Sequence, residues 1–124
     1  MGEDGKMRTL KAVLDGFNNH DPDAIVENFV EDCVFEAPRG AHFRGRRFEG
    51  REAVRAGFAD RFAGIPDVHY GDDSHFISGD RGVSEWTLTG TALAGKPIKV
   101  RGCDLWTFQG DKIARKDSYW KIVE

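Results

Sequence analysis

The 124 residues include only two cysteines and four prolines, and they contain no long run of apolar side chains. Cys33 and Cys103 stand far apart and outside any CxxC spacing. This favours reduced thiols in a cytoplasmic protein, with a single disulfide between them as the alternative. No apolar stretch reaches the length of a bilayer, and residues 1–6 have no apolar signal core. We therefore expect a soluble, cytoplasmic protein with no membrane contact, export signal or lipid anchor.

An excess of positive charge is also missing, since 18 Lys and Arg stand against 21 Asp and Glu, a formal net charge of −3. Broad nucleic-acid binding relies on cationic surface to displace counterions, so we expect no nucleic-acid partner. The one basic segment, Arg39–Phe48, interleaves cations and aromatics and could contact an acidic ligand or RNA. We favour a solvated loop.

Patterns typical of metal sites, phosphate loops and nucleophilic catalysis are absent from the sequence as well. His69 and His75 are predicted to share one strand face, but six residues place them roughly 20 Å apart at about 3.3 Å per residue. They are therefore not a ligand pair. There is no Gly-x-Ser-x-Gly elbow and no Cys/His nucleophile pattern. We expect neither a metal nor a cofactor.

What the sequence does contain is three helical patterns followed by strands. Met7 to Phe17 carries apolar residues at steps of three and four, which predicts a helix that ends near Asn18. Asp21-Pro22 is typical of a helix start, and Ile25 with Phe29 predicts a second, shorter helix there. A third helix should open at Gly50-Arg51 and end at Ile65-Pro66. We predict a flexible tail over residues 1–6 and a single domain over residues 7–124.

From Asp67 onward the apolar period changes to two. We expect three strands and a terminal one in this part of the chain, separated by turns at residues 79–82, 94–97 and 109–112. Such short connections predict antiparallel hairpins. These strands add to a short β-prone stretch earlier in the chain, at Val34-Phe35. Helices first and strands second are typical of the α+β class, with the helices on one face of the sheet.

Asp104 stands in the middle of an otherwise apolar strand face. Alternation places it on the buried side together with Ile98, Val100, Gly102, Trp106 and Phe108. A buried carboxylate needs a partner, or its pKa rises until it is neutral. One interpretation is a structural aspartate paired with Arg or Lys, or a cap at a bulge near Gly102. The other is the acid or base of a pocket.

The three tryptophans can lie around the same space. Trp86 alternates with Ser84 and Leu88, and Trp120 alternates with Ser118 and Ile122. For each one alone, core packing is the simpler interpretation, but together with Trp106 and Asp104 they favour a binding cavity. Lys116 shares the face of Ser118 and is either the partner of Asp104 or a charge at the rim.

From about Met7 to the end, the chain resembles the nuclear transport factor 2-like superfamily, and within it the SnoaL-like polyketide cyclases and steroid delta-isomerases. The segments that carry the resemblance are Asp21–Ile25, Gly50–Val54, Val100–Ile113 and Tyr119-Trp120. It implies a cystatin-like, cone-shaped, curved antiparallel sheet packed against three N-terminal helices. It also implies a pocket between sheet and helices, and a homodimer formed through the sheet.

The resemblance also implies roles for particular residues. In the cyclases an aspartate at the position of Asp104 is the general acid/base, and in the isomerases an acid there stabilises an oxyanion. The position of the catalytic base in the isomerases corresponds to Ala37, and the position of their oxyanion-binding tyrosine corresponds to about Val13. Steroid isomerisation is therefore not expected, unless a register shift puts Glu36 at the position of the base. An insertion after Pro38 brings Arg39, His42 and Arg44 near the predicted pocket mouth.

The sequence therefore predicts a cofactor-independent enzyme of cyclase or isomerase type. Asp104 would act as general acid/base on a hydrophobic carbonyl substrate, in a pocket lined by Trp86, Trp106, Trp120, Phe58, Ser118, Lys116 and His42. The alternative is a non-catalytic pocket domain that binds an apolar small ligand. A protein-interaction adaptor is a third possibility.

Overall fold

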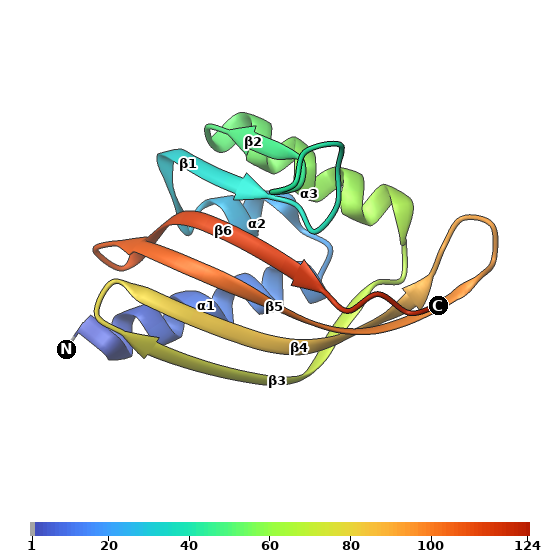
Figure 1. Ribbon diagram of the computed structural model, residues 1–124. Helices are drawn as coiled ribbons and strands as arrows, with labels where there is room; N and C mark the ends of the chain where they lie inside the picture. The colour runs from blue at the N-terminus through green and yellow to red at the C-terminus, as the bar shows by residue number, and fades with distance from the viewer. Residues whose placement is uncertain (1) are drawn as a thin grey trace.

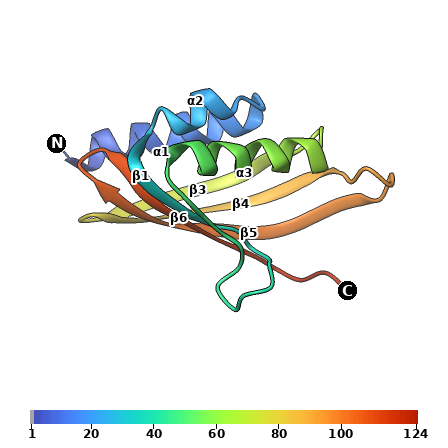
Figure 2. The ribbon, with the colours of Figure 1, turned by 90° about the horizontal axis from the view of Figure 1, so that it is seen from above.

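Helices cover one face of a curved six-stranded sheet, as the α+β interpretation predicts (Figures 1 and 2). The computed structural model describes residues 2–124, and the strand order is β2-β1-β6-β5-β4-β3. The elements in chain order are α1 (Gly2–Asn18), α2 (Pro22–Val26), β1 (Phe29–Glu36), β2 (Arg47–Glu49), α3 (Arg51–Gly64), β3 (His69–Ser78), β4 (Arg81–Thr91), β5 (Pro97–Gln109) and β6 (Lys112–Trp120).

The first two helices differ from the prediction at their ends. Helix α1 already begins at Gly2, so residues 2–6 are helical where a tail was predicted, and Met1 lies outside the described residues. Asp21 caps α2 by accepting a hydrogen bond from the Ala24 amide at 3.2 Å. That helix ends at Val26, and Phe29 belongs to β1 instead, because its backbone pairs with β6. Pairing with a distant strand overrides the local helical spacing here.

The three predicted hairpins are present, since β3–β4, β4–β5 and β5–β6 all pair antiparallel. Two features at the other edge of the sheet were not predicted. Strand β1 runs parallel to β6, because no short turn joins these strands and fixes their direction. Strand β2 pairs with β1, and its three residues are too few to give a periodic signal.

A bulge in β3 overturns the predicted relation between two histidines. The register shifts between Gly71 and Ser74, and Asp72 adopts a left-handed φ of 49°. Such a bulge switches the faces of all later residues in the strand. His75 therefore points inward beside Ser84, whereas His69 is exposed on the other face.

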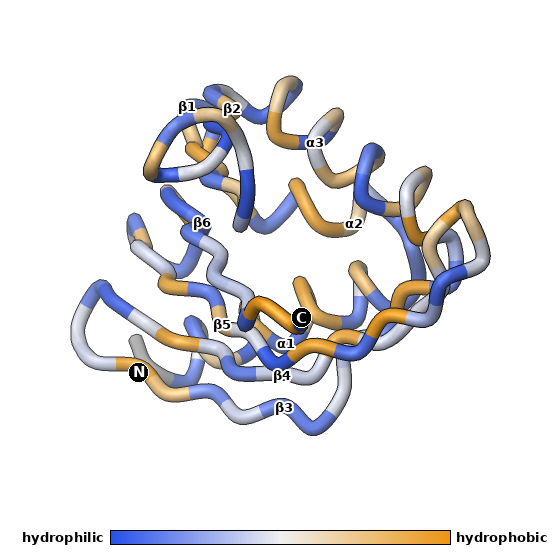
Figure 3. Tube along the Cα trace, turned by 45° about the vertical axis from the view of Figure 1, so that its right-hand side comes forward, coloured by the Kyte–Doolittle hydropathy of each residue, from blue (hydrophilic) through white to orange (hydrophobic). Residues whose placement is uncertain are grey.

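The core lies between the inner face of the sheet and the helices. Its fully buried side chains include Trp86, Phe29, Phe58, Leu10, Ile25, Leu88 and Ile113. Ile122, expected on the inner face with Trp120, lies beyond the end of β6 and is 87% exposed, in the hydrophobic C-terminal segment of Figure 3. Both cysteines are free. Within residues 2–124, no helix is long and apolar enough to cross a membrane.

Candidate functional site

The strand register puts three polar residues side by side on the inner face. Asp104 on β5 lies opposite Ser84 on β4 and opposite Ser118 on β6. All three are buried, and Asp104 is only 4% exposed. Alternation along β5 had predicted this inward position, so the carboxylate is surrounded by protein rather than by solvent.

The Asp104 carboxylate accepts three hydrogen bonds in this interior. Its Oδ1 accepts from Lys116 Nζ at 2.7 Å and from Ser118 Oγ at 2.5 Å, and its Oδ2 accepts from Trp86 Nε1 at 2.9 Å. Lys116 Nζ also donates to Ser118 Oγ at 2.7 Å. Since a buried charge is tolerated only when it is paired and hydrogen-bonded, these contacts explain why a carboxylate can stand in an apolar strand face.

Lys116 is as deeply buried as its partner, at 5% exposure. Its ammonium lies over four aromatic rings, 4.9 Å from the centroid of Phe35, 5.2 Å from Phe17, 5.6 Å from Trp106 and 5.9 Å from Phe58. Burial lowers the pKa of Lys116, and the charge of Asp104 opposes part of that effect. The rings stabilise the ammonium through their quadrupoles, so burial on one side and the rings with Asp104 on the other act in opposite directions on the charge of Lys116.

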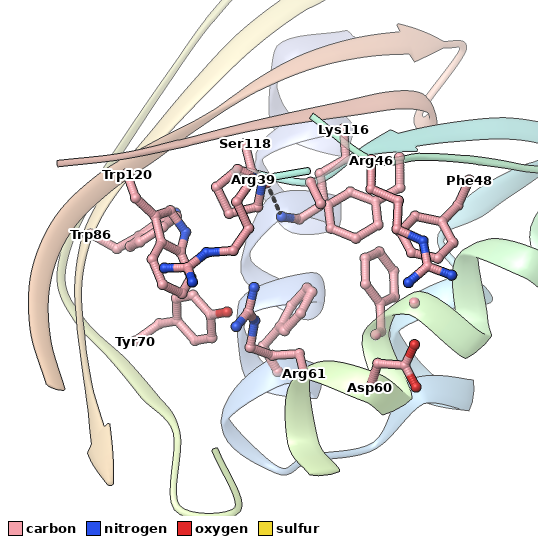
Figure 4. A pocket seen from close by; sticks show the side chains of 16 residues that line it. Arg39, Arg46, Phe48, Asp60, Arg61, Tyr70, Trp86, Lys116, Ser118 and Trp120 are labelled. Carbon is pink, nitrogen blue, oxygen red and sulfur yellow. Dashed lines mark hydrogen bonds between the residues drawn. The ribbon is translucent and has the colours of Figure 1, made fainter. Parts of the chain in front are cut away.

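An aromatic cavity of about 190 Å³ adjoins this pair (Figure 4). Five residues predicted for the pocket line it: Phe58, Trp86, Lys116, Ser118 and Trp120. Asp104 does not line this cavity and lies one layer behind its wall. Asp104 is therefore connected to the cavity through its three hydrogen-bond donors, Lys116, Ser118 and Trp86, all of which line the wall.

Two other predicted pocket residues lie elsewhere. Trp106 borders a separate void of only about 10 Å³ beside Asp104, and its Nε1 donates to Ser84 Oγ at 2.8 Å. His42 is exposed on the loop between β1 and β2, where its ring centroid lies 4.5 Å from that of Phe43. Within the described residues it does not reach the cavity wall.

Tyr70 and Arg61 line the cavity although sequence reasoning missed both. The side chain of Asn18 holds the Tyr70 backbone in place, donating to its carbonyl at 3.0 Å and accepting from its amide at 2.8 Å. Burial raises the pKa of Tyr70 above its usual value, so the phenol keeps its proton. Arg61 follows Phe58 by three residues on α3, and this helical spacing could have indicated a shared face.

The positions that the isomerase resemblance singled out are not equipped for that reaction. Ala37 lines the cavity but has no acid group, and Val13 borders only the small void. Glu36 is buried, and its Oε1 accepts from Arg115 Nε at 2.8 Å. It faces away from the cavity, because its neighbour Phe35 points inward and successive side chains alternate. No register shift brings Glu36 to the site.

No cluster of three or more metal-ligating side chains exists within the described part of the chain. The site instead combines a buried ion pair, aromatic walls and a sheet covered by helices. This fold is that of the nuclear transport factor 2-like, cystatin-like domains. The chain belongs to the SnoaL-like domain family, which it matches over residues 10–116.

Solved structures support the same fold. A candidate polyketide cyclase of Xanthomonas campestris has a TM-score of 0.85 at 20% identity, covering 98% of this chain and 93% of the other. A nuclear transport factor 2-like protein of unknown function from Mesorhizobium loti has a TM-score of 0.81 at 27% identity, covering 98% and 95%. A candidate isomerase of Bacillus subtilis has a TM-score of 0.81 at 20% identity, covering 95% and 87%. Curated proteins give no match.

Proposed function

We propose that the protein is a cofactor-independent enzyme of cyclase or isomerase type that moves a proton on a hydrophobic carbonyl compound bound in the aromatic cavity. The observation that carries the proposal is the buried Asp104–Lys116 pair, whose lysine lines the cavity. Membership of the SnoaL-like family supports the reaction class. A titratable pair beside an apolar pocket is the arrangement that general acid–base catalysis requires.

In this proposal Lys116 is the group that exchanges the proton with the substrate. Asp104 positions Lys116 and takes up its ammonium proton. When the ammonium proton passes to Asp104 across the 2.7 Å hydrogen bond, the neutral amine can accept a proton from the carbon next to the carbonyl. The substrate then becomes an enolate. Returning the proton to another carbon of a conjugated enolate gives isomerisation, whereas attack of the enolate carbon on a second carbonyl of the same molecule gives cyclisation, and the alkoxide that forms takes the proton back from Lys116.

Other residues of the cavity wall would bind the substrate. Trp86 and Trp120 offer flat indole surfaces for a planar ring, and Phe58 forms another apolar part of the wall. Tyr70 supplies a protonated phenol that can donate a hydrogen bond to the enolate oxygen. Such a donor, fixed before the reaction, stabilises charge as it develops.

A second candidate function is the binding of an apolar ligand without turnover. The observation that favours it is the saturation of the Asp104 carboxylate by Lys116, Ser118 and Trp86, which a purely structural ion pair would also show. The two functions differ in one respect that can be measured. Only the enzyme accelerates the exchange of a carbon-bound proton.

The test is deuterium incorporation into 2-indanone, a small planar ketone with acidic α-protons, followed by NMR in D₂O. We expect the protein to accelerate exchange above the buffer rate, and Lys116→Met and Asp104→Asn to reduce this acceleration about 10²- to 10⁴-fold. Lys99→Met, a change of an exposed lysine on the same sheet, should leave the rate unchanged. Asp104→Asn preserves side-chain size, so a folded Asp104→Asn variant with the full rate would rule out the proposed role of the pair.

A further inference from the structure

Three arginines on the cavity wall carry charges that no carboxylate balances. Among the side chains that the structure describes, Arg39, Arg46 and Arg61 form no ion pair within 4.0 Å. By contrast, Arg55 on the same helix as Arg61 pairs with Asp23 at 2.6 Å. Arg44 and Arg81, outside the wall, are also without an ion pair among the described residues, so what distinguishes the wall is that three unpaired guanidinium groups gather around one cavity.

Two of these guanidinium groups share one aromatic ring. The Cζ atom of Arg61 lies 4.5 Å from the Trp120 ring centroid, and that of Arg39 lies 6.0 Å from it. Figure 4 shows both groups beside Trp120, with the Tyr70 hydroxyl pointing toward Arg61. Burial lowers the pKa of Arg61, and the nearby positive charge of Arg39 adds to this effect. Two like charges gathered at one ring repel each other, and an anion between them would relieve this repulsion.

The other charges of the wall do not supply that anion. Lys116 already uses Asp104, which lies behind the wall. Asp60 lines the cavity, yet it forms no ion pair with any of the three arginines. The wall as a whole is cationic although the chain has a net charge of −3. A pocket of one sign with apolar walls concentrates ligands of the opposite charge.

We propose that the cavity binds a planar aromatic ligand carrying an anionic group, a carboxylate or an ionised phenol. The ring would stack against Trp120, and the anionic group would accept hydrogen bonds from Arg61 and Arg39. Guanidinium groups suit this task because they bind carboxylates with two parallel hydrogen bonds and also stack on aromatic faces. A cavity of about 190 Å³ has room for one substituted ring, since cavities of about 150 Å³ hold benzene.

This inference specifies the substrate class of the proposed enzyme. It rests on the proposed function only for the statement that the bound ligand is also turned over. Binding can be measured separately. The probes are benzoate and benzamide, which have nearly the same shape and differ in charge. Chemical-shift titration of the Trp120 indole N–H reports their affinities for the whole chain.

We expect benzoate to bind about tenfold more tightly than benzamide at neutral pH and low salt. Arg61→Gln and, independently, the exposed Arg39→Gln should each remove most of this preference. Arg55→Gln is the matched control on α3 and should keep it. Added NaCl should weaken benzoate and leave benzamide unchanged.

Equal affinities for the two probes, no binding of benzoate, or a preference that survives both cavity variants would overturn the inference. None of these outcomes bears on deuterium exchange into the neutral ketone 2-indanone. Conversely, charge-selective binding without any exchange would uphold the anionic ligand class and overturn the proposed catalysis. The two failures are therefore distinguishable.

Discussion

Gly102 on β5 lies directly opposite Trp86 on β4, and the indole occupies the space that a side chain at Gly102 would need. A Cβ added at Gly102 would stand 2.5 Å from Trp86 Cη2 and 2.6 Å from the Tyr119 carbonyl oxygen. The missing side chain thus lets Trp86 lie flat against β5. From there its Nε1 reaches the Asp104 carboxylate at 2.9 Å.

Gly102→Ala should therefore displace Trp86 and lengthen its hydrogen bond to Asp104. Overpacking of this kind costs about 1–3 kcal/mol, so the free energy of unfolding in urea should fall by that amount. The Trp86 indole N–H resonance should move toward the position of a solvent-exposed indole. Gly64→Ala is the control, because a Cβ at Gly64 meets nothing within 4 Å and alanine favours the helix. Equal stability of the two variants would contradict the packing argument.

The buried ion pair should behave as one energetic unit. Lys116→Met leaves the Asp104 carboxylate without a cation, and Asp104→Asn leaves the ammonium without an anion, so each should lower the free energy of unfolding by about 3–5 kcal/mol. The double variant should lose much less than the sum, because no unpaired charge remains. Urea denaturation of all four proteins measures this coupling. Additive losses would show that the two charges do not depend on one another.

A second buried carboxylate gives a prediction away from the cavity. Glu36 is 1% exposed and pairs with Arg115 on β6. Glu36→Gln should lower the free energy of unfolding by about 1–3 kcal/mol, because the neutral amide weakens the charge-assisted hydrogen bond from Arg115, while Asp117 at 3.4 Å still balances the partly exposed guanidinium. Glu49→Gln removes an exposed carboxylate that pairs with Arg47, and it should change stability by less than about 1 kcal/mol. A similar small effect for both would show that burial does not strengthen the Glu36 pair.

Tyr70 should make the protein less stable in alkali. Its pKa is raised above 10.0 in the folded state by burial, whereas the unfolded chain loses this proton near pH 10. Above that pH the folded state binds more protons than the unfolded state, so the free energy of unfolding falls as pH rises, by up to about 1.4 kcal/mol per pH unit. Tyr70→Phe should show a flatter decline above pH 10 in urea titrations. An unchanged slope would place the Tyr70 hydroxyl in water.

Alternation within regular hairpins made much of the site predictable. Between Arg81 and Trp120 the strands are long and joined by tight turns, so Trp86, Asp104 and Ser118 could be assigned to the inner face from sequence alone. How far each side chain reaches from that face toward the cavity could not be assigned from sequence alone. Lys116 has a long side chain that reaches the cavity, while the short carboxylate of Asp104 stays behind it.

The features that escaped prediction lack a local sequence signal. Strand β2 is three residues long, and the bulge at Asp72 depends on one residue with a left-handed φ of 49°. His42 lies in a loop whose course is set by pairing of its ends rather than by periodicity. Arg39 was expected near the pocket mouth and does line the cavity, but its meeting with Arg61 at Trp120 was not predicted, because these residues belong to segments far apart in sequence.

The central claim is that Lys116 and Asp104 form a coupled pair, removed from water, at the edge of the cavity. An NMR titration of the Lys116 side chain in protein labelled with ¹³C and ¹⁵N lysine tests it most directly. We predict a Lys116 pKa below the usual 10.5, because burial disfavours the ammonium, and a still lower pKa in Asp104→Asn, because the opposing charge is gone. A Lys116 resonance that titrates near 10.5 in both proteins would contradict the account.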